Sequence, residues 1–281
     1  MKNLPERHIW RFFVTQDLAV GSELELPEGE AHFASVLRIR SGETVELTNG
    51  AGSVGLATVV SSERNRVRVR VEELFFFEHQ VPLIELFIGV SKPAALEESV
   101  ESAVQLGADR IRFVDTAKSQ KFRSGSSNGN ERIQKIARES CRLSKRPWFC
   151  DVASEVWSLE RVVDTGLTAI FVCDEAPLHD LYHTATGSPG SARHSTLFHE
   201  LTQLAAAQMN GRKLERIALV IGPESGFTNQ EKVDLQDSAS AKSVPLAFVS
   251  LGDRILTVPN AVRAAVTLAA AVSYVPKSLV K

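Results

Sequence analysis

Hydrophobic and polar residues alternate over short segments in the first part of the chain, up to about residue 78. Such alternation is typical of β-strands that bury one face, and turn residues such as Asn49-Gly50 separate the segments. We expect strands at residues 44–47, 54–60 and 67–71. This part of the chain is therefore predicted to form a small β-barrel or sandwich.

After Pro82 the pattern changes to continuous apolar segments that alternate with segments of helical periodicity. The expected strands are at 83–90, 110–114, 168–173, 217–221 and 244–251. The expected helices are at 93–106, 131–143, 195–209 and 259–272. Strands that alternate with helices form a mostly parallel sheet with helices on both faces, so the pattern predicts an α/β domain. We expect two domains, at residues 1–79 and 80–281.

Two segments rich in small and polar residues, 124–130 and 176–193, interrupt this pattern and are expected to be mobile surface insertions. Four histidines lie in or near the second segment, namely His179, His183, His194 and His199. The first two have a spacing that could share a metal, but no carboxylate–histidine motif accompanies them. We therefore expect surface histidines and no metal site.

Two short sequences match enzyme motifs in their letters but not in their context. Residues 50–55 spell G-x-G-x-x-G, which binds dinucleotides only between a strand and a helix. A second strand follows here, so a hairpin turn explains the glycines. Residues 125–129 spell G-x-S-x-G, but they lack the strand-to-helix turn of a hydrolase nucleophile.

The composition limits the class of protein. The chain has 281 residues and three cysteines, too few for a disulfide framework. The first ten residues lack the apolar core of a signal peptide, and the longest apolar stretch, 264–275, is too short to cross a bilayer comfortably. We therefore expect a cytoplasmic protein without a membrane partner. The net charge of −2 by itself argues against a nucleic-acid partner.

The charge is distributed unevenly, and this reverses the last inference. Residues 110–150 contain 11 basic and three acidic side chains, a local net charge of +8. A concentrated positive field attracts polyanions such as RNA, although a solvated helix face is the simpler alternative. Arg66, Arg68 and Arg70 share one face of an expected strand, where they form either an ordinary polar surface or phosphate contacts.

The strand expected at 217–221 leads directly into a turn with two glycines, a proline and a carboxylate, residues 222–226. Open α/β sheets bind ligands at the carboxyl ends of their strands, so this turn is a candidate binding loop. Glu231 fits a capping box with Thr228 and is interpreted as a helix cap. The last expected strand, 244–251, is also followed by a glycine, Gly252. The helix expected at 259–272 is rich in small side chains and is either a core helix or a dimer face.

Several short segments, each weak alone, match the motifs of one family in order and with suitable spacing. They are residues 11–13 (R-F-F), 32–43 (H-x-x-x-V-L-R…G-D), Lys92 with 101–107, 116–119 (T-E-R-S), 222–228 (G-P-E-G-G-F-T) and 251–256 (L-G-x-R-I-L). Nearly the whole chain thus resembles the RsmE-type 16S rRNA uridine-N3 methyltransferases of the SPOUT superfamily. The resemblance implies an N-terminal PUA-like β-barrel that binds RNA and a C-terminal trefoil-knotted α/β domain, in a homodimer.

The resemblance also implies S-adenosylmethionine as the cofactor and 16S rRNA or the small ribosomal subunit as the partner. The implied cofactor-binding residues are Gly222, Pro223, Glu224, Ser225, Gly226, Leu251, Gly252, Ile255, Leu256 and Val258. Methylation at N3 requires the uracil to lose a proton, and we expect Arg146 with Arg11 or Arg7 to stabilise the resulting anion. The expected RNA contacts are Arg66, Arg68, Arg70, Lys118, Arg138 and Arg142.

Three segments depart from the family pattern. Ser225 replaces a glycine, residues 142–146 keep only the Ser and the Arg of E-Q-S-x-R, and residues 257–261 lack an Arg and a Glu. The last segment is more similar to the N-V-S-N-A of ribose-methylating SPOUT relatives. Two alternatives to uridine-N3 methylation follow: another RNA target such as a ribose 2′-hydroxyl, and a non-catalytic RNA-binding or ribosome assembly protein. A third alternative is a generic metabolic α/β enzyme, which would leave the positive segment at 110–150 unexplained.

Overall fold

The computed structural model of the protein describes residues 9–63, 65–120, 127–174, 195–209 and 214–273. The chain divides into two compact units. Unit 1 comprises residues 1–79 and 141–149, and unit 2 comprises residues 80–140 and 150–281. The segment 141–149 falls within the range expected for the second domain, and in the structure it packs with the first unit.

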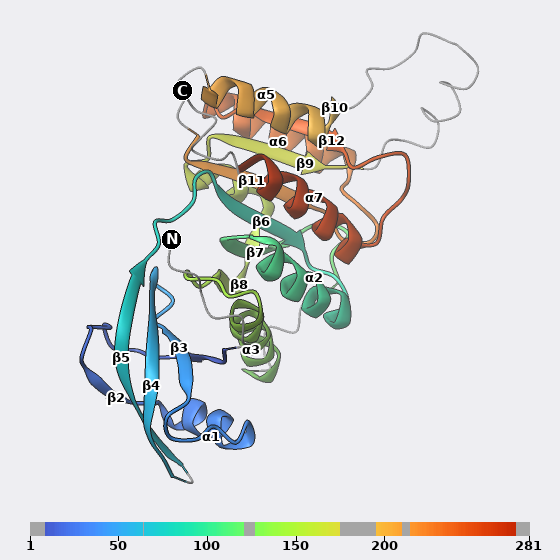
Figure 1. Ribbon diagram of the computed structural model, residues 1–281. Coiled ribbons are helices and arrows are strands. Elements are labelled where there is room, and N and C mark those ends of the chain that lie inside the picture. The colour runs from blue at the N-terminus through green and yellow to red at the C-terminus, as the bar shows by residue number, and fades with distance from the viewer. Residues whose placement is uncertain (1–8, 64, 121–126, 175–194, 210–213, 274–281) are drawn as a thin grey trace. The chain divides into compact units, whose positions relative to one another are not determined.

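Unit 1 contains a five-stranded sheet with the order β1-β3-β4-β5-β2 (Figure 1). The strands are β1 (Arg11–Phe13), β2 (Glu23–Glu25), β3 (Thr44–Thr48), β4 (Ser53–Glu63) and β5 (Arg66–Phe76). The pairing is antiparallel except between β1 and β3, and helix α1 (Glu28–Val36) follows β2. Strands β3, β4 and β5 confirm the alternating pattern, whereas β1, β2 and α1 were not expected.

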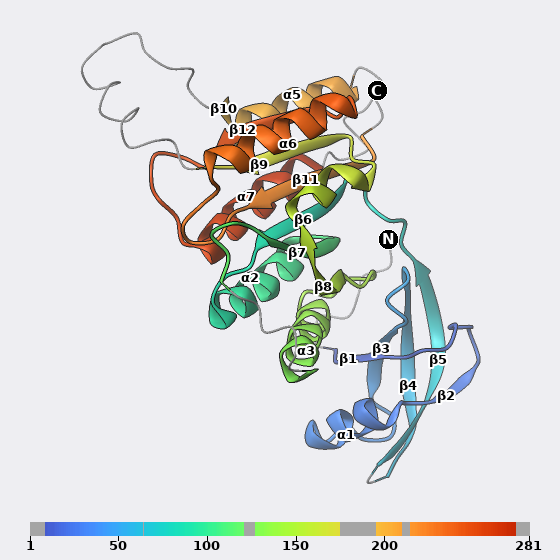
Figure 2. The same ribbon diagram turned by 180° about the vertical axis from the view of Figure 1, so that it is seen from behind.

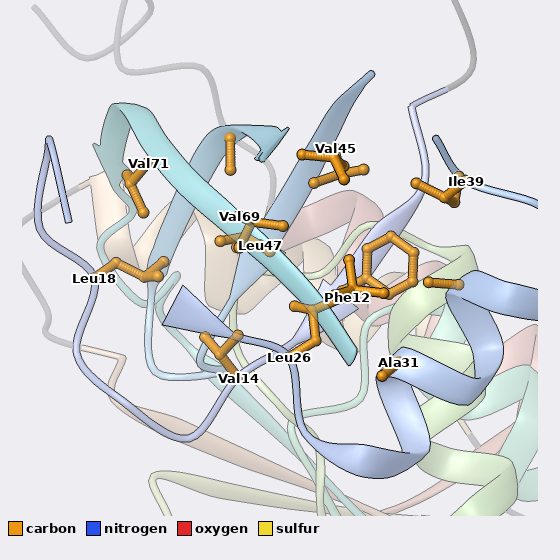
Figure 3. Packing of buried hydrophobic residues seen from close by; sticks show 14 residues of the cluster. Phe12, Val14, Leu18, Leu26, Ala31, Ile39, Val45, Leu47, Val69 and Val71 are labelled. Atoms are coloured by element: carbon orange, nitrogen blue, oxygen red, sulfur yellow. The ribbon is translucent and has the colours of Figure 1, made fainter. Parts of the chain in front are cut away.

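The alternation in β5 shows why this segment forms a strand. Val67, Val69 and Val71 are fully buried, while the arginines between them are exposed. The valines are part of a cluster that includes Phe12 from β1 and Leu47 from β3 (Figure 3). Strand residues that alternate in this way bury one face only, so unit 1 has a core on one side of the sheet.

Unit 2 contains a seven-stranded sheet with the order β10-β12-β9-β11-β6-β7-β8, and its strands pair in parallel. The strands are β6 (Leu83–Gly89), β7 (Arg110–Asp115), β8 (Asp151–Ser158), β9 (Ala169–Cys173), β10 (Ser195–Thr196), β11 (Arg216–Ile221) and β12 (Leu246–Ser250). The expected parallel α/β architecture is confirmed, and β8 and β10 are the strands that the pattern did not predict.

Helices cover both faces of this sheet (Figures 1 and 2). The helical segments of unit 2 are α2 (Pro93–Leu106), η1 (Leu159–Thr165), α5 (Leu197–Met209), α6 (Asn229–Ala241) and α7 (Val258–Ser273). Helix α3 (Ser127–Leu143) begins in unit 2 and ends in unit 1. On one face α2 and α5 contact α7, and on the other η1 and α6 pack over Phe87 and Val220.

Two helix boundaries can be compared directly with the sequence pattern. The end of α2 at Gly107 is confirmed. This glycine has a φ of +116°, a backbone conformation that is strained for residues with a side chain. Helix α3 begins at Ser127 rather than at residue 131, so the expected insertion at 124–130 was wrong for its second half. Its first part, residues 124–126, and the segment 176–193 lie outside the described residues.

Candidate functional site

A pocket lies in unit 2 at the carboxyl ends of β9, β11 and β12. The space between its lining atoms is about 750 Å³, part of which is open to solvent. The residues that line it are Cys173, Asp174, Ile221, Gly222, Pro223, Glu224, Gly226, Ser250, Leu251, Gly252, Asp253, Arg254, Ile255, Leu256, Val258 and Ala261. Parallel strands end at one edge of a sheet, which explains how two loops distant in sequence form one pocket.

The structure brings together nine of the ten expected cofactor-binding residues in this pocket. Ser225 is the exception, because its side chain is exposed and it is not a lining residue. The other lining residues, which are not among those expected to bind the cofactor, are Cys173, Asp174, Ile221, Ser250, Asp253, Arg254 and Ala261. Asp174 carried a usable signal, since it is a polar residue directly after a predicted strand.

Glycines shape the wall of the pocket. Gly226 has a φ of +63° and Gly252 a φ of +127°, and a Cβ added at either position would have no atom within 4 Å. The backbone at both positions is therefore open to a ligand. Gly89 has the opposite role, because a Cβ there would lie 2.5 Å from Pro223 Cδ. Only glycine at this position lets the loop lie so close to the end of β6.

The lining combines an apolar surface with acidic side chains. Ile255 is 63% exposed although it lies in the lining, so a large hydrophobic side chain faces open space there. Glu224 Oε1 accepts a hydrogen bond of 3.4 Å from the Lys92 N–H, and Asp174 forms an ion pair with Lys232. Arg254 also lies in the lining and Lys232 neutralises Asp174, so Glu224 and Asp253 are the lining carboxylates that can face a ligand with positive charge.

Cys173 lies in the lining but is unsuited to act as a nucleophile. Burial, together with the neighbouring Asp174 carboxylate, raises the pKa of its thiol to about 12. A thiol with this pKa stays protonated at neutral pH, and the thiolate is the reactive form. Cys173 is therefore a small lining residue without covalent chemistry.

Arg11 and Arg142 are buried in unit 1, where each arginine binds a carboxylate. The Arg11 Nε donates to Glu46 at 2.9 Å, and the Arg142 guanidinium donates to both Glu30 oxygens at 2.8 and 2.9 Å. Arg142 is 7% exposed, so the expectation that it contacts RNA phosphate does not fit this structure. It instead stabilises unit 1.

Arg146 is half-buried, and its carbonyl accepts a hydrogen bond of 2.7 Å from Arg11 Nη1. Arg11 thus has a structural role: with 3% exposure it holds the backbone of Arg146. Arg7, the other N-terminal candidate, lies outside the described residues. Arg138 is exposed on α3.

The arginines on β5 are exposed but paired with acidic residues of β2. Arg68 and Arg70 both donate to Glu23, at 2.5 and 2.6 Å, and Arg66 donates to Glu25 at 3.1 Å. The hydrogen bond from Arg70 and the nearby Arg68 lower the pKa of Glu23, so this carboxylate stays charged. The paired carboxylates reduce the positive field of the β5 face.

Lys118, another expected RNA contact, is exposed in unit 2, and its Nζ donates to the Ser225 and Phe227 carbonyls.

The rejected motifs have structural explanations. Gly50 and Gly52 lie in the turn between β3 and β4, where added Cβ atoms would overlap with Phe149 and Trp148. The hairpin interpretation of residues 50–55 is confirmed.

Within the described part of the chain, no group of three His, Cys, Asp or Glu is placed to hold a metal ion. His199 is exposed, and His179, His183 and His194 lie outside that part.

The capping box at the start of α6 is confirmed. The Glu231 N–H donates to Thr228 Oγ1 at 3.2 Å, and Glu231 Oε2 accepts from the Thr228 N–H at 2.7 Å. In addition, none of the helices in the described residues is both long and apolar enough for a membrane span.

Comparisons with known proteins agree with this geometry. Residues 78–270 match the family model described as RNA methyltransferase domain, and residues 26–72 match the model described as RNA methyltransferase PUA domain. The chain is 26% identical over 241 residues to the ribosomal RNA small subunit methyltransferase E of Mycobacterium bovis, covering 85% of this chain and 81% of that protein. It is 25% identical to the protein of the same name from Rickettsia conorii, covering 89% and 91%.

One solved structure shows the same fold over almost the whole chain. It is a ribosomal RNA small subunit methyltransferase E from Neisseria gonorrhoeae bound to S-adenosyl methionine. The TM-score is 0.70 at 22% identity, with 92% of this chain and 95% of that chain covered.

Proposed function

We propose, from the premise that this chain belongs to the RNA methyltransferase domain family, that it methylates N3 of a uridine in small-subunit rRNA with S-adenosylmethionine as the methyl donor. The observation that carries the proposal is the pocket at the carboxyl ends of β9, β11 and β12. Its open glycine backbones lie in the two loops that the resemblance implies for the cofactor. The Mycobacterium and Rickettsia relatives are named for methylation of small-subunit rRNA.

The lining fits S-adenosylmethionine in shape and charge. The apolar side chains of Leu251, Ile255 and Leu256 offer a surface for the adenine, and the backbone at Gly226 and Gly252 is open for close approach. The carboxylates of Glu224 and Asp253 offer a negative field to the positively charged half of the cofactor. When bound, the cofactor supplies an activated methyl group on a sulfonium. Positioning is the main task of the protein in such a displacement.

The acceptor atom sets the second requirement. N3 of uracil lies on the Watson–Crick edge, so the base must be unpaired or flipped out. As the bond from N3 to the methyl carbon forms, the carbon–sulfur bond breaks and the sulfur keeps its electron pair. The N3 proton leaves to a base or to solvent, and a nearby cation favours the uracil anion. We assign this cation to Arg146, with Arg11 as the residue that positions its backbone; Arg7 is the other N-terminal candidate.

RNA binding is assigned to exposed basic side chains of both units. The candidates are Arg138 on α3 and the partly neutralised arginines of β5. The proposal also includes the division of labour between domains: residues 1–79 form the RNA-binding domain, and residues 80–281 form the methyltransferase domain. The protein is further proposed to act in the cytoplasm as a homodimer. We also propose that the cofactor loops form a trefoil knot, as in the family that the sequence resembles.

The cofactor assignment is tested by calorimetry with S-adenosylmethionine and a matched pair of glycine variants. Gly252→Ala places a methyl group in the pocket at a positive φ, and we expect a loss of affinity of at least tenfold. Gly42→Ala is the control, because this glycine also has a positive φ and open space but lies in unit 1. Equal affinity of the two variants, or no binding by the unmodified protein at millimolar cofactor, would contradict the assignment and favour a non-catalytic RNA-binding protein.

The target is tested by mass spectrometry of nucleosides from small ribosomal subunits treated with the protein and cofactor. The proposal expects N3-methyluridine; 2′-O-methylated nucleosides would instead support the ribose alternative suggested by residues 257–261. Arg146→Ala should abolish methylation while cofactor affinity changes less than twofold. Arg40→Ala, which removes an exposed arginine of unit 1, should leave the methylation rate unchanged. Full activity of Arg146→Ala would refute the role of this residue.

A further inference from the structure

The loop at residues 222–228 forms one wall of the pocket and connects β11 to α6. Its backbone contains a turn, in which the Gly226 N–H donates to the Pro223 carbonyl at 2.8 Å. A binding loop positions its ligand only if neighbouring residues hold it in place. In unit 2 the segment at residues 116–119, directly after β7, provides such contacts.

We propose that Lys118 is a positioning residue that fixes this loop for cofactor binding, an inference that rests on the proposed function. The Lys118 Nζ donates to the Ser225 carbonyl at 2.9 Å and to the Phe227 carbonyl at 3.3 Å. An ammonium group has three donors and no acceptor, so one lysine can bridge two carbonyls. These carbonyls flank Gly226, whose backbone is open towards the pocket.

A second contact joins the same two segments. The Ala117 N–H donates to Glu231 Oε1 at 2.7 Å, while Glu231 Oε2 accepts from the Thr228 N–H at 2.7 Å. Glu231 therefore caps α6 and at the same time links the end of the loop to the residue before Lys118. The loop is held on both sides of Phe227.

The segment that carries Lys118 is itself anchored. Ser119 Oγ accepts from the Thr116 N–H at 3.0 Å, and the hydroxyl groups of these two residues lie 3.0 Å apart. The Gln120 N–H donates to the Val90 carbonyl at 3.1 Å. Because both ends of the turn are fixed, the Lys118 side chain extends from a defined backbone position, and less conformational entropy is lost when it holds the loop.

This geometry gives Lys118 a different role from the RNA contact that the charge pattern suggested. Its ammonium is directed to backbone carbonyls of the candidate cofactor loop. A phosphate contact would affect RNA binding, whereas a loop contact affects cofactor binding in the absence of RNA. The two roles therefore predict different effects of the same substitution.

The test compares Lys118→Met with Lys135→Met in the full chain. Methionine has a similar length but no donor, and Lys135 is an exposed lysine on α3. Calorimetry with S-adenosylmethionine and no RNA should show about tenfold weaker binding for Lys118→Met and no change for Lys135→Met. Lys118→Arg retains several donors and should restore affinity to within about threefold of the unmodified protein.

A second measurement needs no cofactor. Amide hydrogen exchange of residues 225–231 should be faster in Lys118→Met than in the unmodified protein, with no such change in Lys135→Met. Unchanged exchange, or unchanged affinity in a protein that binds the cofactor, would overturn the inference. If the unmodified protein does not bind the cofactor but Lys118→Met exchanges faster, the loop contact is supported and the proposed function fails.

Discussion

Several arginines of this chain bind buried carboxylates, so their charge stabilises the fold instead of forming a surface field. Arg142 and Glu30 are each less than 10% exposed, and the guanidinium also lies over the rings of Phe13 and Phe33, at 4.3 and 4.6 Å from their centroids. Breaking such a buried pair leaves an uncompensated charge and is strongly destabilising. Arg142 is thus part of a buried ion pair, although it lies in the segment 110–150 whose charge alone indicated RNA binding.

Unit 2 contains a comparable group around Glu85. Burial raises the pKa of Glu85, although Arg112 and Arg216 favour its charged form. Arg112 also donates to the Asp151 carbonyl at 3.0 Å and lies 5.2 Å from the Trp157 ring centroid. Since the native pKa is raised, the stabilisation from this carboxyl is present at low pH and is lost as pH rises through the native pKa.

Glu46 has the opposite behaviour and provides a test at the scale of one residue. Burial would raise its pKa, but hydrogen bonds from Arg11 and Lys145 lower it below the ordinary value. Stability from this group is therefore present above the ordinary pKa and is lost as pH falls through the native pKa. Glu46→Gln should destabilise unit 1 by about 2 kcal/mol at pH 7, and the difference should shrink towards zero in acid.

Urea unfolding at pH 7 and at successively lower pH, followed by tryptophan fluorescence, measures this effect. Glu43→Gln is the control, since Glu43 is an exposed glutamate of unit 1. A Glu46→Gln deficit that stays constant with pH would show that the ion pairs do not depend on the ionisation of this carboxyl.

At the scale of elements, glycines set how closely chain segments approach one another. The hairpin turn between β3 and β4 packs against residues 147–149, where the Gly52 N–H donates to the Pro147 carbonyl at 2.9 Å and the Phe149 N–H donates to the Gly50 carbonyl at 2.9 Å. The segment 141–149 is thereby part of unit 1. The letters G-x-G-x-x-G describe a packing requirement of this turn and no nucleotide site.

Gly50→Ala and Gly21→Ala separate packing from backbone strain at such turns. Both glycines have a positive φ, +70° and +82°, but an added Cβ meets Phe149 Cδ2 at 2.0 Å only at Gly50. We expect Gly21→Ala to lower the free energy of unfolding by about 1 kcal/mol and Gly50→Ala by about 3 kcal/mol. Thermal and urea unfolding measure both values, and equal losses would rule out a packing role for Gly50.

At the scale of the whole molecule, the basic segment at 110–150 is divided among several tasks. Arg112 and Arg142 are buried, Arg132 pairs with Glu97 at 2.7 Å, and Lys118 donates to the Ser225 carbonyl in the loop at residues 222–228. Side chains such as Arg138 remain exposed on α3. The positive surface available to RNA is therefore smaller than the net charge of +8 suggests.

Salt dependence of RNA binding tests this division. The logarithm of affinity for a 16S rRNA fragment should fall linearly with the logarithm of salt concentration, as phosphate contacts release counterions. Arg68→Ala should reduce the slope by less than one, because Glu23 already neutralises part of that charge. Filter binding or fluorescence anisotropy between 50 and 200 mM salt, roughly the range in which such effects are large, gives the slopes. A flat dependence in the unmodified protein would exclude RNA binding through phosphates.

The sequence by itself determined the two kinds of local structure and the loops of the candidate site. Periodicities of two and of 3.6 residues are local properties, so strands such as β5 and helices such as α2 were predictable. The binding loops were predictable because glycines directly follow apolar strands. Only the tertiary structure decided which charges are exposed: Arg142 meets Glu30 and Lys118 meets Ser225 across more than a hundred residues, since burial depends on partners that folding brings together.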